Sequence, residues 1–199
     1  FVDVAPKVGL TLTHLASKEQ HYIVESMSGG VGFLDCDNDG RLDVVVTNGS
    51  NVDRYREGGD LMVTLYRQGT DGKFTNITEQ AGLSVKGWGM GIAVADFDND
   101  GNLDLYVTYW GSNVLYRNNG NGSFSDVTAR AGVAGNGEWS TGCTFIDYDR
   151  DGYVDLLVTS YLQFKPEKTP LPGQQPFCMW KGSPVYCGPR GLPFGSLTL

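Results

Sequence analysis

The sequence contains few of the residues and patterns on which several common classes of function depend. Of its 199 residues only His14 and His21 are histidines, and no apolar run reaches the length needed to cross a membrane. The basic residues form no patch, which argues against a nucleic-acid partner. The G-x-S-x-G and H-E-x-x-H motifs of hydrolases and metalloproteases are absent. We therefore expect no nucleic acid, no transmembrane segment and no catalytic constellation.

A sustained helical spacing of apolar residues is also missing, which excludes coiled-coil and α/β folds. The apolar content of 40% is ordinary, so the chain is not expected to be disordered. Its 28 glycines follow no collagen period and indicate many turns instead. An all-β fold with short strands is the prediction that remains.

What the sequence does contain is an acidic nine-residue motif, present three times. It reads D-C-D-N-D-G-R-L-D at 35–43, D-F-D-N-D-G-N-L-D at 96–104 and D-Y-D-R-D-G-Y-V-D at 147–155. Each copy has Asp at positions 1, 3, 5 and 9 and Gly at position 6. Carboxylates this close repel one another unless a cation lies between them, and many oxygen ligands in a flexible cage suit Ca²⁺ better than Mg²⁺. The motif predicts three Ca²⁺ sites.

Each predicted site takes four carboxylates and the backbone carbonyl of position 7, and the glycine permits the sharp turn that brings them together. The first site would consist of Asp35, Asp37, Asp39, Asp43 and the carbonyl of Arg41. The second would consist of Asp96, Asp98, Asp100, Asp104 and the carbonyl of Asn102. The third would consist of Asp147, Asp149, Asp151, Asp155 and the carbonyl of Tyr153. The formal charge of −8 would fall to about −2 with three ions bound.

An EF-hand does not fit these loops, because its position 12 is a bidentate Glu. Position 12 here is Val46, Val107 and Val158, and the segments that follow are rich in β-branched and aromatic residues. Each loop is therefore expected to lead into a strand. A simple hairpin turn is the alternative for one copy, but three copies with every Asp retained disfavour it.

Further motifs repeat out of phase with the acidic loops. L-Y-R begins at 65 and 115, and F-x-D/N-V/I begins at 1, 74 and 124. A unit of four strands in about 50 residues is typical of a β-propeller blade, with a parallel solenoid as the alternative. We predict a strand and link completing another blade at 1–10, blade one at 11–83, blade two at 84–133 and an incomplete blade three at 134–199. Polar insertions are expected near 49–60, as a surface loop, and at 162–193.

Fewer than three blades cannot close a ring, since propellers have about four to eight. The predicted last strand, at 195–199, would correspond to the strand that carries L-Y-R in the other blades. We therefore expect an open edge, completed by remaining blades or by strands of other chains.

The cysteines and the start of the chain favour an extracellular setting. Cys178 and Cys187 flank a Pro/Gly-rich stretch with little core to hold it, so a disulfide is expected there. Cys36 and Cys143 are expected to be free, partly buried thiols. The start at Phe1 is interpreted as a processed N-terminus. Candidate glycosylation sequons begin at Asn48, Asn76 and Asn121.

The acidic loops resemble the calcium loops of FG-GAP repeats, as found in the propellers of integrin α-chains. The longer pattern from G-W-G-M-G at 87–91 through L-Y-R-N-N-G-N-G-S-F is similar to secreted FG-GAP/VCBS proteins of the ASPIC/UnbV group, as is C-M-W-K-G-S-P-V-Y-C. The resemblance implies a calcium-binding propeller outside the cell, usually seven-bladed. It implies no particular reaction.

Two classes of function follow. The first is a binding, adhesion or structural module that recognises protein or glycan through its loops. The second is a propeller-scaffold enzyme acting on extracellular polysaccharide, which requires a pocket with converging titratable groups away from the acidic loops. Because the sequence shows no such group, the module is the favoured hypothesis.

Overall fold

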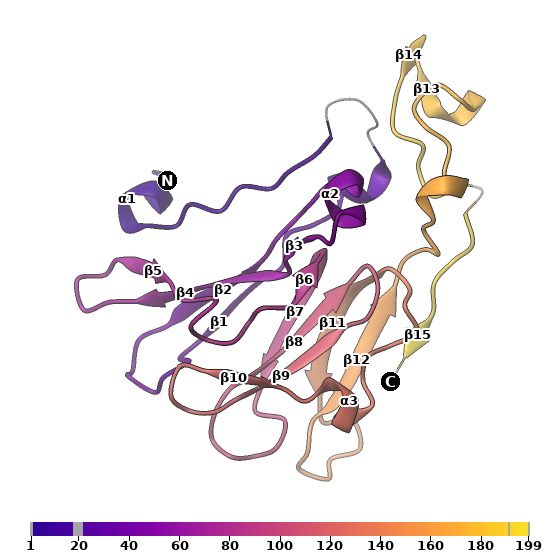
Figure 1. The fold of residues 1–199 in the computed structure, drawn as a ribbon. Coiled ribbons are helices and arrows are strands. Elements are labelled where there is room, and N and C mark those ends of the chain that lie inside the picture. Colours follow the sequence, from indigo (N-terminus) through magenta and orange to yellow (C-terminus); the bar gives the residue numbers. More distant parts are fainter. Residues whose placement is uncertain (1, 18–21, 191, 199) are drawn as a thin grey trace.

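The structure is a computed structural model that describes residues 2–17, 22–190 and 192–198. Phe1, His21 and Leu199 lie outside this range. The described part contains three main sheets, and every strand pair within them is antiparallel. Figure 1 shows these sheets side by side in chain order, fanning out from β1 to β12 without closing into a ring. The expectation of an all-β chain forming an open part of a propeller is confirmed, and the parallel solenoid is excluded.

The first two sheets have four strands each, in sequential order, and the third has three. The first contains β1 (Val31–Leu34), β2 (Asp43–Thr47), β4 (Val63–Gln68) and β5 (Phe74–Asn76); the second contains β7 (Gly89–Ala95), β8 (Asp104–Tyr109), β9 (Val114–Asn118) and β10 (Phe124–Asp126); the third contains β11 (Ser140–Ile146), β12 (Asp155–Ser160) and β15 (Leu197–Thr198).

The remaining elements are short and lie between or beside the sheets. Two-stranded pairs join β3 (Asp60–Leu61) to β6 (Lys86–Gly87) and β13 (Met179–Trp180) to β14 (Ser183–Pro184). The helices are α1 (Ala5–Val8), α2 (Val52–Arg56), α3 (Thr128–Ala131) and the 3-10 turns η1 (Ile23–Ser26), η2 (Pro166–Lys168) and η3 (Pro176–Cys178). No helix in the described ranges is both long and apolar enough to span a membrane.

A threonine at or near the end of the second strand links each sheet to the next. Thr108 Oγ1 donates to the carbonyl of Thr141 in the third sheet at 3.0 Å and accepts the N–H of Gly91 at 2.7 Å. Thr47 makes the corresponding bond to Met90 of the second sheet at 2.9 Å. A Cβ on Gly91 would lie 2.2 Å from the Thr141 carbonyl oxygen, so the innermost strands approach this closely only because that position is glycine.

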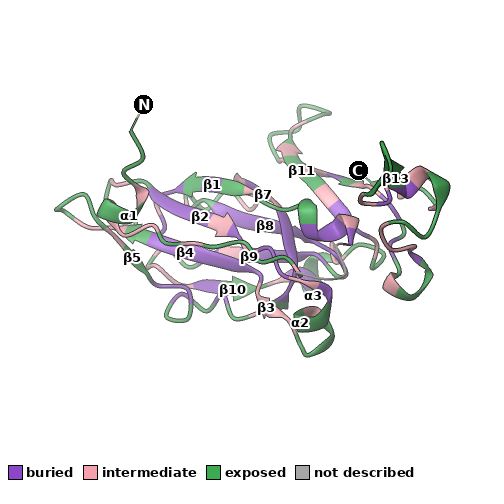
Figure 2. Cartoon of the chain, turned by 90° about the horizontal axis from the view of Figure 1, so that it is seen from above, coloured by how far each residue is buried: buried purple, intermediate pink, exposed green. Residues whose placement is uncertain are grey.

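The core lies between the sheets and extends to the segments that connect them, and it is rich in aromatic side chains. Trp88 and Trp139 are fully buried, and Trp110 packs between Trp88 and Phe164 with ring centroids 5.7 and 5.0 Å away. Figure 2 shows burial along β2, β4 and β8, whereas β11 has one buried residue, Ser140, followed by alternating intermediate and exposed residues. The first two sheets are therefore more completely packed than the third.

The polar segment near 49–60 is more structured than a solvated surface loop. It forms α2, with Asn51 capping the helix by accepting the N–H of Arg54. Val52 is 1% exposed, and the ring of Tyr55 stacks on Trp110 at 4.3 Å. Two apolar side chains thus anchor a segment whose charged residues Asp53, Arg54 and Arg56 remain exposed.

The segment at 162–193 leaves the third sheet after β12 and returns to it at β15, which pairs with β12. Its β13–β14 hairpin projects at the upper right of Figure 1. Cys178 and Cys187 form the expected disulfide, and both cysteines are buried in an otherwise exposed region. At the other end of the chain, residues 2–4 form no strand, so their completion of another blade remains a prediction.

Candidate metal centres

Each acidic loop connects the first two strands of its sheet, and the three loops share one internal scaffold. The N–H groups of Asp39 and Gly40 donate to the two carboxylate oxygens of Asp35 at 3.0 and 2.7 Å. Asp96 and Asp147 receive the same pair of bonds from positions 5 and 6 of their own loops. Position 4 has a positive φ in all three loops, and the glycine at position 6 has one too. The repeated sequence therefore gives a repeated backbone.

The Asp at position 9 begins the second strand and holds the loop to the sheet. Asp104 is fully buried, and its two oxygens accept the N–H groups of Phe97 at 3.0 Å and Asn118 at 2.8 Å. Asp43 makes the same two bonds, to Cys36 and Gln68. Asp155 is only half-buried, and within the described ranges only the N–H of Tyr148 donates to it.

The Asp at position 3 provides the test of whether a cation fits. Asp37 Oδ1 and Asp98 Oδ1 are buried and have no hydrogen-bond partner among the described residues. A buried carboxylate oxygen without a partner is costly, so such an atom calls for an explanation. Carboxylate oxygens of Asp96, Asp98 and Asp104 lie within 4.8 Å of one another, as do those of two corresponding sets. The residues fit a hard cation that would supply the missing partner.

The corresponding sets are Asp35, Asp37 and Asp39 in the first loop and Asp147, Asp149 and Asp155 in the third. The remaining predicted side-chain ligands, Asp43, Asp100 and Asp151, belong to the same loops, as do the position-7 residues Arg41, Asn102 and Tyr153.

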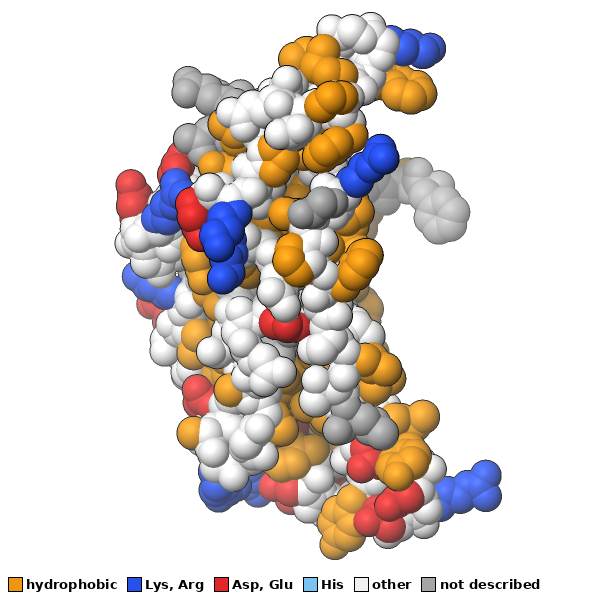
Figure 3. Space-filling model, turned by 90° about the vertical axis from the view of Figure 1, so that its right-hand side faces the viewer, with side chains coloured by type: hydrophobic (Ala, Val, Ile, Leu, Met, Phe, Trp, Pro, Cys, Tyr) orange, Lys and Arg blue, Asp and Glu red, His pale blue; other side chains and the backbone are white. Residues whose placement is uncertain are grey.

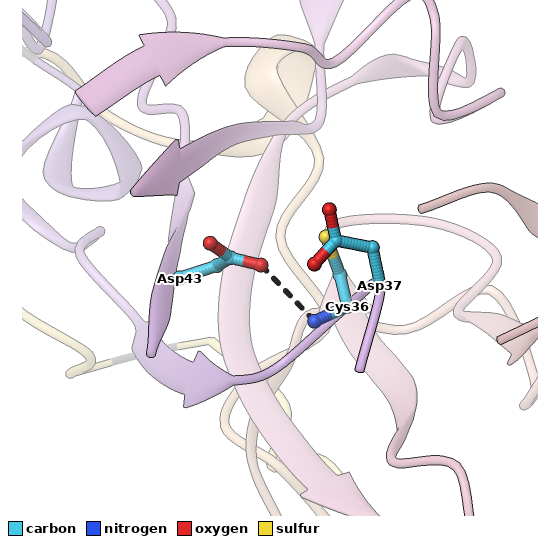
Figure 4. A group of neighbouring side chains, drawn as sticks. All are labelled: Cys36, Asp37 and Asp43. Carbon is cyan, nitrogen blue, oxygen red and sulfur yellow. Dashed lines mark hydrogen bonds between the residues drawn. The ribbon is translucent and has the colours of Figure 1, made fainter. Parts of the chain in front are cut away.

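Cys36, at position 2 of the first loop, lies beside Asp37 and Asp43, as Figure 4 shows. The thiol is fully buried, and burial together with the neighbouring Asp43 raises its pKa well above the usual range. Because only the thiolate is a good metal ligand, Cys36 is not suited to bind a cation here. Cys36 and Cys143 are both free, and Cys143 is partly buried.

Two arginines next to the loops were not among the predicted site residues. Arg117, from β9, contacts Asp98 at 2.5 Å and also Asp100 of the same loop. Arg67, from β4, lies 3.5 Å from Asp37. Both are the Arg of the L-Y-R motif, whose return at 65–67 and 115–117 was the available signal. Their positive charges reduce the repulsion among the carboxylates of the adjacent acidic loop.

The electrostatics of the loops follow from burial and crowding. Burial raises the pKa of Asp104 to about 6, even though two backbone N–H groups oppose the rise. Burial also raises the pKa of Asp37, with Asp39 adding to the effect. Hydrogen bonds from Asn102 lower the pKa of Asp100, and Arg117 contributes in the same direction. A bound cation would favour the charged form of every one of these groups.

The candidate sequons differ in accessibility. The side chain of Asn48 is held between the carbonyl of Leu61 and the hydroxyl of Thr64, and Ser50 of the same sequon is fully buried. Asn76 and Asn121 are exposed and use only their carbonyl oxygens. Glycosylation at Asn76 and Asn121 stays a prediction, whereas Asn48 is a poor acceptor.

A cavity of about 380 Å³ lies between the second and third sheets, lined by Tyr106, Leu156 and Ser160 among others. Glu138 is the one acidic residue in the described lining, and its carboxylate accepts the N–H and the O–H of Ser196. Those bonds lower its pKa. The described lining of this cavity therefore contains a single carboxylate, where a glycoside hydrolase uses two.

Comparison with known families agrees with the geometry of the loops. A family model described as an FG-GAP-like repeat matches residues 35–107 and, in a second copy, residues 98–158. The chain belongs to the FG-GAP-like repeat family. The two matched regions together contain all three acidic loops of this FG-GAP chain, and the resemblance inferred from the sequence is confirmed.

Curated relatives come from one group. The chain is 32% identical over 84 residues to cartilage acidic protein 1 of Xenopus tropicalis, covering 42% of this chain and 13% of that protein. It is 27% identical over 133 residues to the Mus musculus protein of the same name, covering 64% and 20%. The FG-GAP chain thus spans one fifth or less of the length of these relatives.

Proposed function

We propose that this chain is a calcium-binding part of an extracellular β-propeller that recognises protein or glycan partners through its loops. The observation that carries the proposal is the partnerless, buried oxygen at position 3 of the first and second loops, Asp37 Oδ1 and Asp98 Oδ1. A cation ligated there would pair that oxygen and neutralise part of a cluster of four carboxylates.

Each Ca²⁺ would be held by the side chains at positions 1, 3, 5 and 9 and by the carbonyl at position 7. The cation supplies positive charge and no reaction chemistry. The chain's own residues do the rest: position 1 organises the loop backbone, and position 9 fixes the loop to the sheet. Since an unfolded loop cannot assemble this set, the free energy of binding adds to the free energy of folding.

The extracellular setting is supported by the disulfide between Cys178 and Cys187, which forms in oxidising compartments. Low-affinity calcium cages suit a compartment with millimolar calcium. The matching relatives are cartilage acidic proteins. Loops on a rigid scaffold are where partners usually bind, and adhesion or structural assembly is the proposed role.

The proposal is tested by removing and restoring the ion. Excess chelator should lower the melting temperature markedly, because one site at a hundredfold excess of ion over Kd contributes about 2.7 kcal/mol. Ca²⁺ should restore the original temperature and Mg²⁺ should restore it poorly. Asp98→Ala should remove one of three binding equivalents in a calorimetric titration. Identical melting curves with chelator and with calcium would contradict the proposal.

A further inference from the structure

The first and second acidic loops are in direct contact through the side chain of Asn38. This residue occupies position 4 of the first loop, between the proposed ligands Asp37 and Asp39, and has a φ of 58°. Its Nδ2 donates to Oδ1 of Asn102 in the second loop at 2.8 Å. The two residues are 64 positions apart in sequence. A side chain of one loop, flanked by ligands, therefore touches the other loop.

Asn102 passes this contact on to a proposed ligand of its own loop. Its Nδ2 donates to Oδ1 of Asp100 at 2.8 Å. An ionised carboxylate only accepts hydrogen bonds, so the amino side of the Asn102 amide must face Asp100 and its carbonyl must face Asn38. The relay from Asn38 through Asn102 to Asp100 thus has a single consistent orientation.

The glycine-rich turn of the second sheet lies beside Asn102, whereas Asn38 is exposed. A Cβ on Gly120 would lie 2.8 Å from Asn102 Oδ1, so this turn leaves little space for the amide to move. The N–H of Gly122 donates to the carbonyl of Cys36 in the first loop at 3.0 Å. One turn therefore contacts both acidic loops and holds Asn102 between them.

We propose that Asn102 is a positioning residue that makes Ca²⁺ binding at the first loop strengthen Ca²⁺ binding at the second. An ion held by Asp37 and Asp39 fixes Asn38 between them, Asn38 fixes the amide of Asn102, and that amide holds Asp100 in place for the second ion. The side chain of Asn102 does this while its backbone carbonyl remains available as a ligand. The inference rests on the proposed function, since it requires ions in both loops.

The second and third loops provide an internal comparison. Asn99, at position 4 of the second loop, donates to the backbone carbonyl of Gly152 at 3.1 Å and not to a side chain that reaches a ligand. Coupling between these two loops should be weaker. Two nearby cations also repel each other, so the sign of the coupling is informative: repulsion alone gives negative cooperativity, and the relay gives positive cooperativity.

The experiment measures the calcium affinity of the second loop by calorimetry, with its neighbours disabled in turn. Asp37→Ala disables the first loop and Asp149→Ala disables the third, so the double variant reports the second loop alone. With the first loop restored, the second should bind about fivefold more tightly or better, a typical size for coupling between sites. With the third loop restored, the gain should be smaller.

Asn102→Ala and Asn38→Gly should each abolish the gain from the first loop and leave the effect of the third unchanged. Glycine is used at position 38 because alanine would be strained at a positive φ. Asn38→Gly leaves all twelve ligand carboxylates intact, so it also serves in the otherwise unaltered chain. There the cooperative rise of the binding curve should disappear.

The outcomes separate the two proposals. If the second loop binds calcium with equal affinity with and without Asp37→Ala in the first, the coupling alone is overturned. A gain in the affinity of the second loop that survives Asn102→Ala would overturn it as well. A second loop that binds more weakly when the first is occupied would show that repulsion outweighs the relay and would also overturn it. If none of the three loops binds calcium, the proposed function and the coupling are overturned together.

Discussion

The second and third sheets carry nearly the same pattern of residues but differ in how completely that pattern is satisfied. Thr108 donates its hydroxyl to the neighbouring sheet, whereas Thr159 is exposed and donates to Gly142 within its own sheet, at 3.3 Å. Asp104 is fully buried, whereas Asp155 is only half-buried. The acidic motif gives the same loop conformation in both sheets. The neighbouring strands and sheets determine how much each residue of the motif contributes to the stability of the fold.

This contrast separates two contributions to stability. Within a loop, the bonds from positions 5 and 6 to position 1 form regardless of what lies outside. The second contribution comes from bonds between strands. In the second sheet, the N–H of Asn118 in β9 donates to Asp104 at position 9 of the loop. The described residues of the third sheet contain no corresponding bond to Asp155. Matched substitutions in the two sheets can therefore measure the second contribution alone.

The largest difference is expected for position 9. Asp104→Ala in chelated protein leaves the N–H groups of Phe97 and Asn118 without their acceptor, and each buried unpaired donor costs about 1–3 kcal/mol. We expect a net loss of about 2 kcal/mol in the free energy of unfolding, because removal of the buried charge, whose burial raises the pKa of Asp104, offsets part of the cost. Asp155→Ala should cost about 1 kcal/mol or less. Urea unfolding in excess chelator measures both, and equal losses would contradict the comparison.

The disulfide tests whether the excursion from the third sheet is stabilised independently of the other two. Closing a loop with nine residues of sequence separation contributes about 2.5 kcal/mol by the loop-entropy estimate. Cys178→Ser with Cys187→Ser should raise hydrogen exchange throughout 162–193 and leave β2, β4 and β8 protected. Loss of protection in the first two sheets as well would show that the excursion is coupled to the whole structure.

A smaller effect is expected at the threonines that link the sheets. Thr108→Val removes the bonds to Gly91 and Thr141 with little change in shape, and water can recover part of the loss because Gly91 is half-buried. We expect a loss of about 1–2 kcal/mol. Thr159→Val, at an exposed position, should stay within about 0.5 kcal/mol of the unaltered protein. Thermal melts of both variants provide the measurement.

A separate prediction concerns pH. Asp104 has an ordinary pKa of 3.8, raised to about 6 in the folded, ion-free chain, so the folded state holds an extra proton between these values. Stability of the chelated protein should therefore fall as pH rises from about 4 to about 6 and then level off. Asp104→Asn should remove this part of the slope, with Asp155→Asn as control. Calcium should bind more weakly below about pH 6, because protons compete for the carboxylate.

The sequence was sufficient for the parts of the structure that depend on local spacing. The acidic loops, the strands that follow them and the disulfide could be predicted because each is specified within about ten residues. The partners of Arg67 and Arg117 could not be predicted, since each contact joins a third strand to a carboxylate 17 or more residues away. The relay between Asn38 and Asn102 depends on the placement of two sheets, which no spacing within one motif encodes.

The segment near 49–60 shows the opposite limitation. Its composition is polar, and composition alone predicted a surface loop without a helix or an anchor in the core. The structure depends instead on Tyr55, whose ring stacks on Trp110 and so joins the segment to the aromatic core. The charged side chains around it are consistent with either outcome, because an amphipathic helix needs only one apolar side.

The link through Thr47 and Thr108 has a consequence for how such chains change over generations. Both links use one threonine hydroxyl, one backbone carbonyl and a glycine that permits the approach, and none of these is peculiar to a given pair of sheets. A duplicated four-stranded sheet would therefore form the same threonine-to-carbonyl hydrogen bond with its new neighbour. Gain or loss of whole sheets by recombination within a gene would preserve this hydrogen bond, while the sequences of the loops between strands could diverge.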